Sequence, residues 1–330
     1  MSIRQIDEFA NPQMIISERP SDIRSRRIAD ADHDELAALL SKGLGYPKSY
    51  FLKLFERLKS HPTPVGFPKY GYVLVSDGSI VGAILLIFSK IQGGGTSDVR
   101  CHVTSWYVKP DYRAYATVFF SRALKHEGVT YLNVSARPGT LPIIGLQGFS
   151  VYSNGQFVTM PLLHLPSPSA DKEEVEVATA AKIPNGQFDP FERDLLLTHE
   201  GYGNISFWCS SAGSAYPFIF QKRLFKGMLP GAQLIYSRDV ADFVRFVRPL
   251  ALALASRGIF VVRIDSNGPI PGLIGKYFRG MEPRYYKGGA KPRLGDLTYT
   301  QSVMVHHLRK PNWVITKIDE LKGILRKRKP

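Results

Sequence analysis

Two short turns of the same form interrupt this chain, and each lies between two apolar runs of strand-forming residues. The first reads Ser76-Asp77-Gly78-Ser79, and the second reads Ser211-Ala212-Gly213-Ser214. Asp-Gly between apolar runs is a strong hairpin signal, because these residues tolerate the positive φ angles of a tight two-residue turn. We therefore predict two β-hairpins, one in each half of the chain.

A similar order of elements is predicted around each hairpin. The first half gives helices that begin at Asp32 and span Ser49–Leu58 and Ala114–His126, with strands at Tyr72–Val75, Ile80–Ser89, Arg100–Val108 and Val129–Val134. The second half gives helices at Pro190–His199 and Asp239–Ser256, with strands at Ile205–Cys209, Ala215–Phe220, Gln233–Ser237, Ile259–Ile264 and Thr298–Val305. This repetition predicts a duplicated mixed α/β fold, each copy a mostly antiparallel sheet flanked by helices.

Residues 165–186 separate the two halves. They contain three prolines and an acidic cluster, and they hold no large aromatic side chain that could anchor them in a core. We therefore expect an irregular leader at 1–20, a first domain at 21–164, a linker at 165–186, a second domain at 187–308 and a basic tail at 309–330.

The charge of the chain is strongly positive. Lys and Arg number 43 against 28 Asp and Glu, which gives a formal net charge of +15 and a pI near 9.7. Such a surface attracts nucleic acid, acidic lipid or a phosphorylated cofactor. Because no nucleic-acid motif is present, we favour a single anionic ligand site and expect no nucleic-acid partner. The basic tail could contact a membrane surface weakly, although a frayed solubilising end is the commoner role.

Other features exclude several classes of protein. Two cysteines cannot form a disulfide framework or a cysteine zinc cage. No apolar run reaches the roughly 20 residues of a membrane-spanning helix, and the first residues lack the apolar core of an export signal. His306 and His307 are neighbours whose side chains would diverge on a strand, so no metal is predicted. We expect a cytoplasmic protein.

A candidate anion site follows the predicted strand that ends at Val108. The chain runs through Lys109–Arg113 and then enters a predicted helix. The first N–H groups of a helix have no partner within it, and the helix dipole adds partial positive charge there. A pyrophosphate suits this position, and Arg113 would place a cation beside it.

At these residues the sequence resembles the GNAT superfamily of acyl-CoA-dependent acyltransferases. Val108-Lys109-Pro110 matches the family's Val-x-Pro, Arg113–Val118 lies where the family has an Arg/Gln-x-x-Gly-x-Gly/Ala loop, and Gly148-Phe149 matches a later Gly-Phe. The resemblance spans about residues 23–160 and implies GNAT-like domains in tandem, with acetyl-CoA or another acyl-CoA as co-substrate. It places the cofactor against Trp106, Tyr107, Val108, Arg113, Ala114, Tyr115, Ala116, Thr117 and Val118.

The resemblance implies transfer of an acetyl or longer acyl group to an amine or hydroxyl acceptor, whose identity the sequence does not give. His102 is the candidate base, because no other side chain of its strand titrates near neutrality. Tyr152 is a candidate acid for the departing thiolate. The plainer interpretation of both is structural, as a hydrogen-bonded histidine and a packing tyrosine. Trp106 and Tyr107 must face opposite sides of their strand, and the sequence does not decide which faces the cofactor.

The chain also departs from the family pattern. Ala116 and Val118 replace the loop glycines, and a Cβ atom narrows the approach of phosphate to the backbone. Ile144 stands where family members often have the tyrosine that acts as the acid. These departures favour an alternative hypothesis, a catalytically silent GNAT-like binding or scaffold protein.

The second half lacks the phosphate-loop signature. Ser237-Arg238-Asp239 follows the matching strand, and Asp239 is a predicted helix N-cap whose charge would repel pyrophosphate. We expect this half to shape the substrate site or the interface between the copies and not to bind cofactor.

Overall fold

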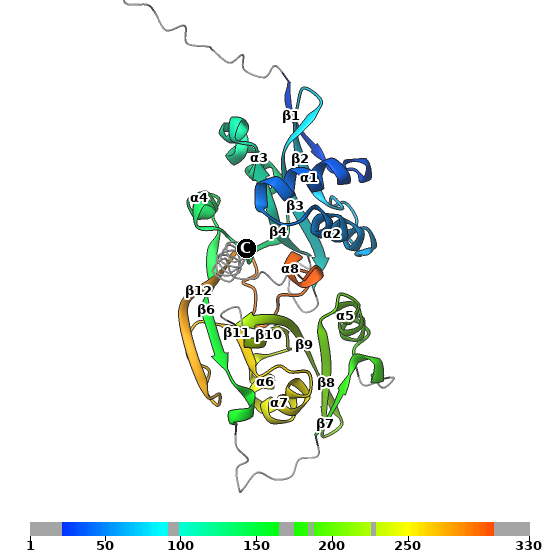
Figure 1. Cartoon of the computed structure of the whole chain (residues 1–330), viewed down its shortest axis with the longest axis vertical. Helices are drawn as coiled ribbons and strands as arrows, with labels where there is room; N and C mark the ends of the chain where they lie inside the picture. Colours follow the sequence, from blue (N-terminus) through cyan, green and yellow to red (C-terminus); the bar gives the residue numbers. More distant parts are fainter. Residues whose placement is uncertain are drawn as a thin grey trace, which may run out of the picture.

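The computed structural model describes residues 22–91, 99–164, 175–183, 186, 188–225 and 229–306. Over these residues the chain forms one twelve-stranded sheet with helices on both faces, and the two halves of the sequence lie at opposite ends of it (Figure 1). The predicted mixed α/β fold with a mostly antiparallel sheet is confirmed. The leader 1–20 and the basic tail 309–330 lie outside the described residues. No helix in the described ranges is long and apolar enough to span a bilayer.

The first half follows its predicted order, with two strands that were not predicted, one before and one after the predicted series. Its strands are β1 Ile23–Arg27, β2 Gly71–Ser76, β3 Ser79–Lys90, β4 Val99–Val108, β5 Val129–Asn133 and β6 Ser150–Thr159, and its helices are α1 His33–Leu44, α2 Lys48–Ser60, α3 Ala116–Ala123 and α4 Leu141–Leu146. The turn between β2 and β3 has φ of 47° at Asp77 and 79° at Gly78, as its sequence predicts.

The second half contains β7 Glu176–Thr179, β8 Ile205–Ser211, β9 Ser214–Phe225, β10 Leu229–Tyr236, β11 Val261–Ser266 and β12 Gly275–Lys287, with helices α5 Pro190–Gly201, α6 Val240–Arg245, α7 Val247–Ala255 and α8 Gln301–Met304. The strand β7 lies inside the segment 165–186 that was expected to be a linker. The prediction of a strand at Thr298–Val305 is wrong. A turn of helix replaces it, because Val303 packs in the core of the second half while Met304 packs in that of the first.

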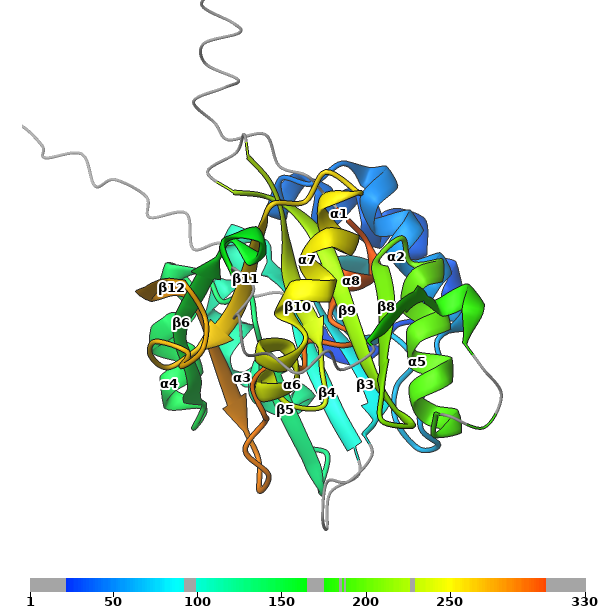
Figure 2. The same cartoon turned by 90° about the horizontal axis from the view of Figure 1, so that it is seen from below.

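Strand β3 is buried on both faces, so the first half has a layer of helices on each side of the sheet. Ala83, Leu85 and Ile87 pack against α1 and α2, whereas Ile84, Leu86 and Phe88 pack on the side of α3 and α4. In the second half, α5 covers one face of the sheet, and α6 and α7 cover the other (Figure 2). Each half therefore has two apolar clusters, one on each side of the sheet.

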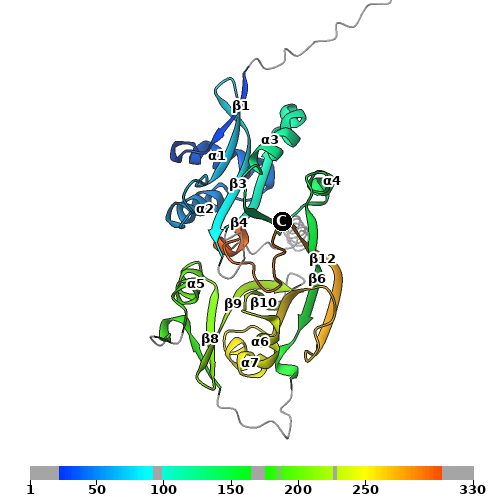
Figure 3. The same cartoon turned by 180° about the vertical axis from the view of Figure 1, so that it is seen from behind.

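Strands from the two halves alternate at the centre of the sheet. The order is β1-β2-β3-β4-β5-β12-β6-β11-β10-β9-β8-β7. Strand β12 of the second half pairs with β5, for example at Tyr286↔Leu132, and also with β6. Strand β6 of the first half pairs with β11, for example at Ile264↔Phe157. The view from behind shows β6 and β12 side by side between the two ends (Figure 3). Each half thus contributes one strand to the other.

Candidate active site

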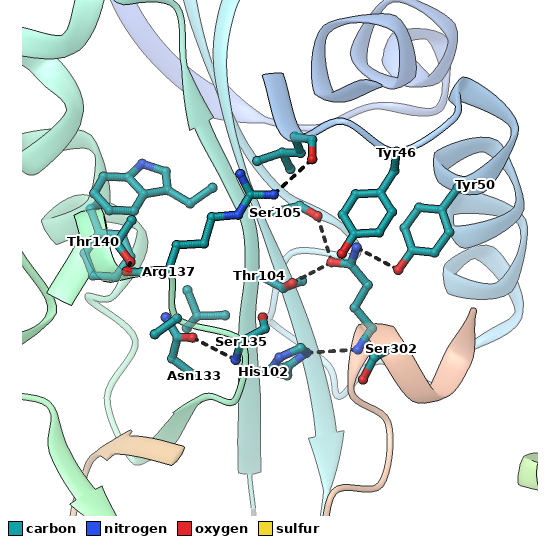
Figure 4. A pocket seen from close by; sticks show the side chains of 16 residues that line it. Tyr46, Tyr50, His102, Thr104, Ser105, Asn133, Ser135, Arg137, Thr140 and Ser302 are labelled. Atoms are coloured by element: carbon teal, nitrogen blue, oxygen red, sulfur yellow. Dashed lines mark hydrogen bonds between the residues drawn. The ribbon is translucent and has the colours of Figure 1, made fainter. Parts of the chain in front are cut away.

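The first half opens between β4 and β5. These parallel strands pair from Val99↔Val129 to His102↔Leu132, after which β4 continues to Val108 while β5 ends at Asn133. A cavity of about 130 Å³ lies in this opening, lined by β4, the end of α1, the start of α2, the segment after β5, and α8 (Figure 4). An extended ligand could therefore lie along the unpaired edge of β4.

A β-bulge shapes β4 at this cavity. Ser105 has φ of 46°, and the pairing of β4 with β3 shifts register between Ala83 and Leu85. A bulge leaves one residue unpaired and bends its strand, and bulges often lie next to active sites. The bend turns the Ser105 backbone out of the regular ladder beside the cavity. No local pattern signals this bulge, because residue 105 is a serine and not the glycine or asparagine that usually marks a positive φ.

Gln301 connects the cavity to the second half of the chain. Its Oε1 accepts hydrogen bonds from Thr104 Oγ1 at 2.5 Å and Ser105 Oγ at 2.7 Å, and its Nε2 donates to the Tyr50 hydroxyl at 3.1 Å. Its backbone N–H donates to His102 Nδ1 at 3.1 Å (Figure 4). Sequence reasoning missed Gln301, which is 199 residues from His102 along the chain.

His102 lines the cavity but is 4% exposed. Burial, together with the charges of Arg100 and Arg284, lowers the pKa of His102 to about 3, so the ring is neutral at physiological pH. Its Nδ1 lone pair is occupied by the Gln301 N–H. Its Nε2 is buried and has no hydrogen-bond partner among the described residues. This geometry leaves no lone pair of His102 open to a proton.

Trp106 and Tyr107 face opposite sides of the sheet, as their neighbouring positions require. Trp106 lines the cavity and packs on Phe120, with ring centroids 4.5 Å apart. Tyr107 packs against α1, where its ring fills the space beside Gly43. Val108 is buried and pairs with Gly82. The structure thus places Trp106, and not Tyr107, at the cavity.

The expected phosphate loop begins as a 3-10 helix. Pro110–Tyr115 adopts this conformation, and Ala116–Val118 form the first turn of α3. The amide of Ala116 already donates to the Arg113 carbonyl, so fewer amides face outward than in a glycine-rich loop. The turn is not covered by Val118, which is 55% exposed. Ala114 and Thr117 are exposed, while Tyr115 is half-buried.

A cation also lines this cavity. Arg137, in the segment after β5, lines the cavity and donates from Nη2 to the Leu44 carbonyl at 2.9 Å, which links the two walls (Figure 4). Arg137 was not predicted from the sequence. Its position in the loop just after the strand next to β4 was a usable signal, because loops at strand ends often carry functional residues.

Tyr152 lies apart from this group. It is on β6, 2% exposed, and its ring packs edge-on against Tyr286. Burial and the nearby charge of Asp265 raise the pKa of Tyr152 well above its usual value. It is not among the residues that line the cavity. The structure therefore does not bring Tyr152 together with His102 at the cavity.

The second half has an equivalent opening, and the chain itself fills it. Parallel pairing of β10 with β11 stops at Gln233↔Arg263, while β10 continues to Tyr236. Here Leu297 N–H donates to the Ile235 carbonyl at 2.8 Å, and Ser237 N–H donates to the Gly295 carbonyl at 3.1 Å. Residues 294–297 thus lie along β10 as an added strand would.

The helix that follows β10 begins as predicted. Asp239 caps α6, where its Oδ1 accepts the Ala241 N–H at 2.8 Å. Arg238 is held by Glu192 through two hydrogen bonds of 2.6 and 2.7 Å. Within the described residues, no group of three or more His, Cys, Asp or Glu side chains could hold a metal ion.

No protein-family model matches the chain, and no curated protein matches it. Among solved structures, the chain is similar to a GCN5-related N-acetyltransferase from Kribbella flavida, with 13% identity, a TM-score of 0.50, and coverage of 80% of this chain and 70% of that chain. It is also similar to a GCN5-related N-acetyltransferase from Anabaena variabilis, with 12% identity, a TM-score of 0.50, and coverage of 81% and 72%. The chain therefore has the GNAT fold.

Proposed function

We propose that this protein transfers an acyl group from acyl-CoA to an amine or hydroxyl acceptor in the cavity between β4 and β5. The observation that supports this most directly is the unpaired edge of β4, which carries a bulge at Ser105 and faces a cavity. An extended pantetheine arm can pair with such an edge as a further strand would. The GNAT fold agrees with this activity.

The donor would lie along β4 and end at the turn after it. Trp106 would contact the pantetheine arm from inside the cavity, and Val108 would pair with it through its backbone. Arg113 and the first turn of α3 would hold the diphosphate, with the exposed Arg113 guanidinium supplying charge. Because a 3-10 helix presents few free amides, we expect side-chain charge to contribute more here than in a glycine-rich loop.

The acceptor would enter from the side of α1 and α2. Tyr46, Tyr50 and Ser302 line the cavity there, and no carboxylate does so among the described residues. A neutral amine or a hydroxyl fits this lining better than a cation, because nothing in it would balance a buried positive charge.

Two GNAT-like halves, 21–164 and 187–308, would share one donor site. Residues 294–297 occupy the opening of the second half at the place where a pantetheine arm would otherwise pair with β10. We therefore expect each chain to bind one acyl-CoA.

A catalytically silent binding protein is the second candidate. The absence of a carboxylate among the described lining residues and the internally bonded Ala116 amide favour it. Only the first candidate predicts that the acyl group moves, and a silent protein could act either as an acyl-CoA binder or as a scaffold.

A thermal-shift titration followed by a thiol-release assay tests both candidates. Acetyl-CoA and longer acyl-CoAs should raise Tm in proportion to the logarithm of their concentration above Kd. Free CoA thiol should then appear when a panel of amines and alcohols is added. Stabilisation without thiol release on any acceptor would favour a silent acyl-CoA-binding protein, and no stabilisation by any acyl-CoA would reject acyl transfer and favour a scaffold.

A further inference from the structure

We propose that His102 donates a hydrogen bond from Nε2 to the carbonyl oxygen of the acyl group, and that Gln301 is the positioning residue that holds His102 in the tautomer required. This inference rests on the proposed acyl transfer and assigns a role within it to two residues from opposite halves of the chain. It replaces the role of base that the sequence suggested for His102.

The hydrogen bond between Gln301 and His102 fixes the tautomer. A backbone N–H can only donate, so His102 Nδ1, which lies 3.1 Å from the Gln301 nitrogen, must accept. Burial and the charges of Arg100 and Arg284 lower the pKa of His102, so the ring is neutral. A neutral imidazole whose Nδ1 accepts carries its hydrogen on Nε2.

The Nε2–H group is a buried donor that needs a partner. Buried polar groups in proteins are nearly always hydrogen-bonded, and an exception calls for an explanation. His102 is 4% exposed and lines the cavity, while its Nε2 has no partner among the described residues. In the proposed complex the thioester carbonyl reaches this buried donor from the cavity and supplies its missing partner, because it is the acceptor oxygen that an acyl-CoA brings to the site.

Gln301 is itself held rigidly, so the donor is preorganised. Its side chain bonds to Thr104, Ser105 and Tyr50. Three residues earlier, the Thr298 carbonyl accepts from Arg100 Nη2 at 2.9 Å, which ties the same segment to β4. A hydrogen-bond donor that is already fixed in place stabilises the transition state most when it points at the atom where negative charge develops.

The reaction balances with His102 retaining its proton. The acceptor nitrogen or oxygen forms a bond to the carbonyl carbon, and the carbonyl π electrons move to its oxygen, which His102 Nε2–H then stabilises. The carbonyl re-forms as the C–S bond breaks, and CoA leaves as the thiolate. The proton lost by the acceptor passes to water. The products are the amide or ester and free CoA.

The tautomer can be read without turnover. In long-range ¹H–¹⁵N spectra of the histidine rings, His102 should be an Nε2–H tautomer at pH 7. His199 provides an internal reference of the opposite tautomer, because its Nδ1 donates to the Leu195 carbonyl at 2.8 Å and its Nε2 accepts from Tyr299 N–H. An Nδ1–H tautomer or a charged ring at His102 would overturn the proposal even if the protein proved to be inactive.

Two substitutions at one position separate the backbone from the side chain. Gln301→Ala keeps the N–H, whereas Gln301→Pro removes it. Proline is tolerated because Gln301 is the first residue of α8 and Thr300 before it is extended, with φ of −77° and ψ of 153°. His102 should remain an Nε2–H tautomer in Gln301→Ala and should become a mixture in Gln301→Pro. An unchanged tautomer in Gln301→Pro would reject the positioning role.

Binding and turnover complete the test. Acetyl-CoA, but not CoA, should slow the exchange of the His102 Nε2–H with water. His102→Ala should lower kcat by roughly 10²–10³-fold, as loss of an oxyanion donor does, and leave the Kd of CoA unchanged. Wild-type kcat in a folded His102→Ala variant would exclude the donor role, whereas a wild-type protein that binds no acyl-CoA would instead reject the proposed function.

Discussion

The guanidinium of Arg100 on β4 lies 2.9 Å from the carboxylate of Asp296, and their side chains are 7% and 14% exposed. Burial alone would raise the pKa of Asp296, but the charges of Arg100 and Arg293 outweigh it and hold that pKa well below its usual value. Arg100 also donates to the Thr298 side chain at 2.5 Å. This buried ion pair therefore joins the two halves directly beside the candidate site.

Asp296→Asn should destabilise the protein strongly. It would leave Arg100 buried without a counter-charge, a change that costs about 3–5 kcal/mol of unfolding free energy. Asp34→Asn is the matched control, because it removes one partner of the exposed pair Lys48–Asp34 and should cost less than about 1 kcal/mol. Urea unfolding of both variants measures the difference. Equal losses would mean that the Arg100–Asp296 pair is not effectively buried.

Arg113→Glu should weaken acyl-CoA binding about tenfold or more, because a charge-assisted hydrogen bond to phosphate is replaced by repulsion. Arg122→Glu makes the same charge change on the exposed last turn of α3 and should have little effect. Calorimetry gives both affinities and the stoichiometry, which we expect to be one acyl-CoA per chain. Two sites per chain would contradict the proposed blocking of the second opening by residues 294–297.

Stability should fall as the pH drops below about 6.5. Burial lowers the pKa of His102 to about 3 and that of His199 to about 4, so the unfolded chain binds more protons than the folded one in this range. Their contribution is complete above pH 6.5 and is lost on the way down to the folded pKa values. At pH 5 the loss should be roughly 2 kcal/mol for each histidine.

Urea unfolding at pH 7.5 and pH 5 measures this loss. In His199→Gln the difference between the two pH values should shrink by the share of one histidine, whatever the variant does to stability at pH 7.5. A difference as large as that of the wild type would show that His199 does not titrate as its burial implies.

Gly43→Ala should destabilise the protein, although alanine is normally the better helix former. A Cβ atom at Gly43 would lie 2.4 Å from the Tyr107 ring, and such overpacking costs about 1–3 kcal/mol. Gly145→Ala in α4 is the control, because no atom lies within 4 Å of its added Cβ, and it should stabilise by about 0.5–1 kcal/mol. Thermal unfolding measures both. Adding Tyr107→Ala should remove most of the Gly43→Ala penalty, and a fully additive double variant would deny the contact.

Local chemistry allowed much of the fold to be predicted from the sequence. The turns at Asp77-Gly78 and Ala212-Gly213 have positive φ at all four residues, as their hairpins require. Most of the helices and strands that were predicted lie within a few positions of those observed, whereas β1, β6, β7 and β12 were not predicted. The start of a helix soon after Val108 was placed correctly too, but its 3-10 first turns were not predicted.

The features that escaped prediction depend on distant contacts. The position of β12 between β5 and β6 follows from pairing between residues far apart in the chain, which no local pattern encodes. The β-branched residues from Thr298 to Val305 favour a strand, but burial of Val303 and Met304 in separate cores overrides that preference. Gln301 also reaches the site through contacts between residues far apart in the chain. The sequence alone therefore could not reveal the hydrogen bond that Gln301 donates to His102.

The exchange of β6 and β12 makes the two halves inseparable as physical objects. A protease that cut the backbone between Leu163 and Val175 would produce two fragments. Each fragment would hold one strand of the other in its part of the sheet, β12 in the first fragment and β6 in the second. Such a cleaved protein should migrate as one particle under native conditions. Its two fragments should separate only when the sheet unfolds. For the same reason the two halves should not evolve independently. A substitution in β6 or β12 changes contacts with strands of both halves.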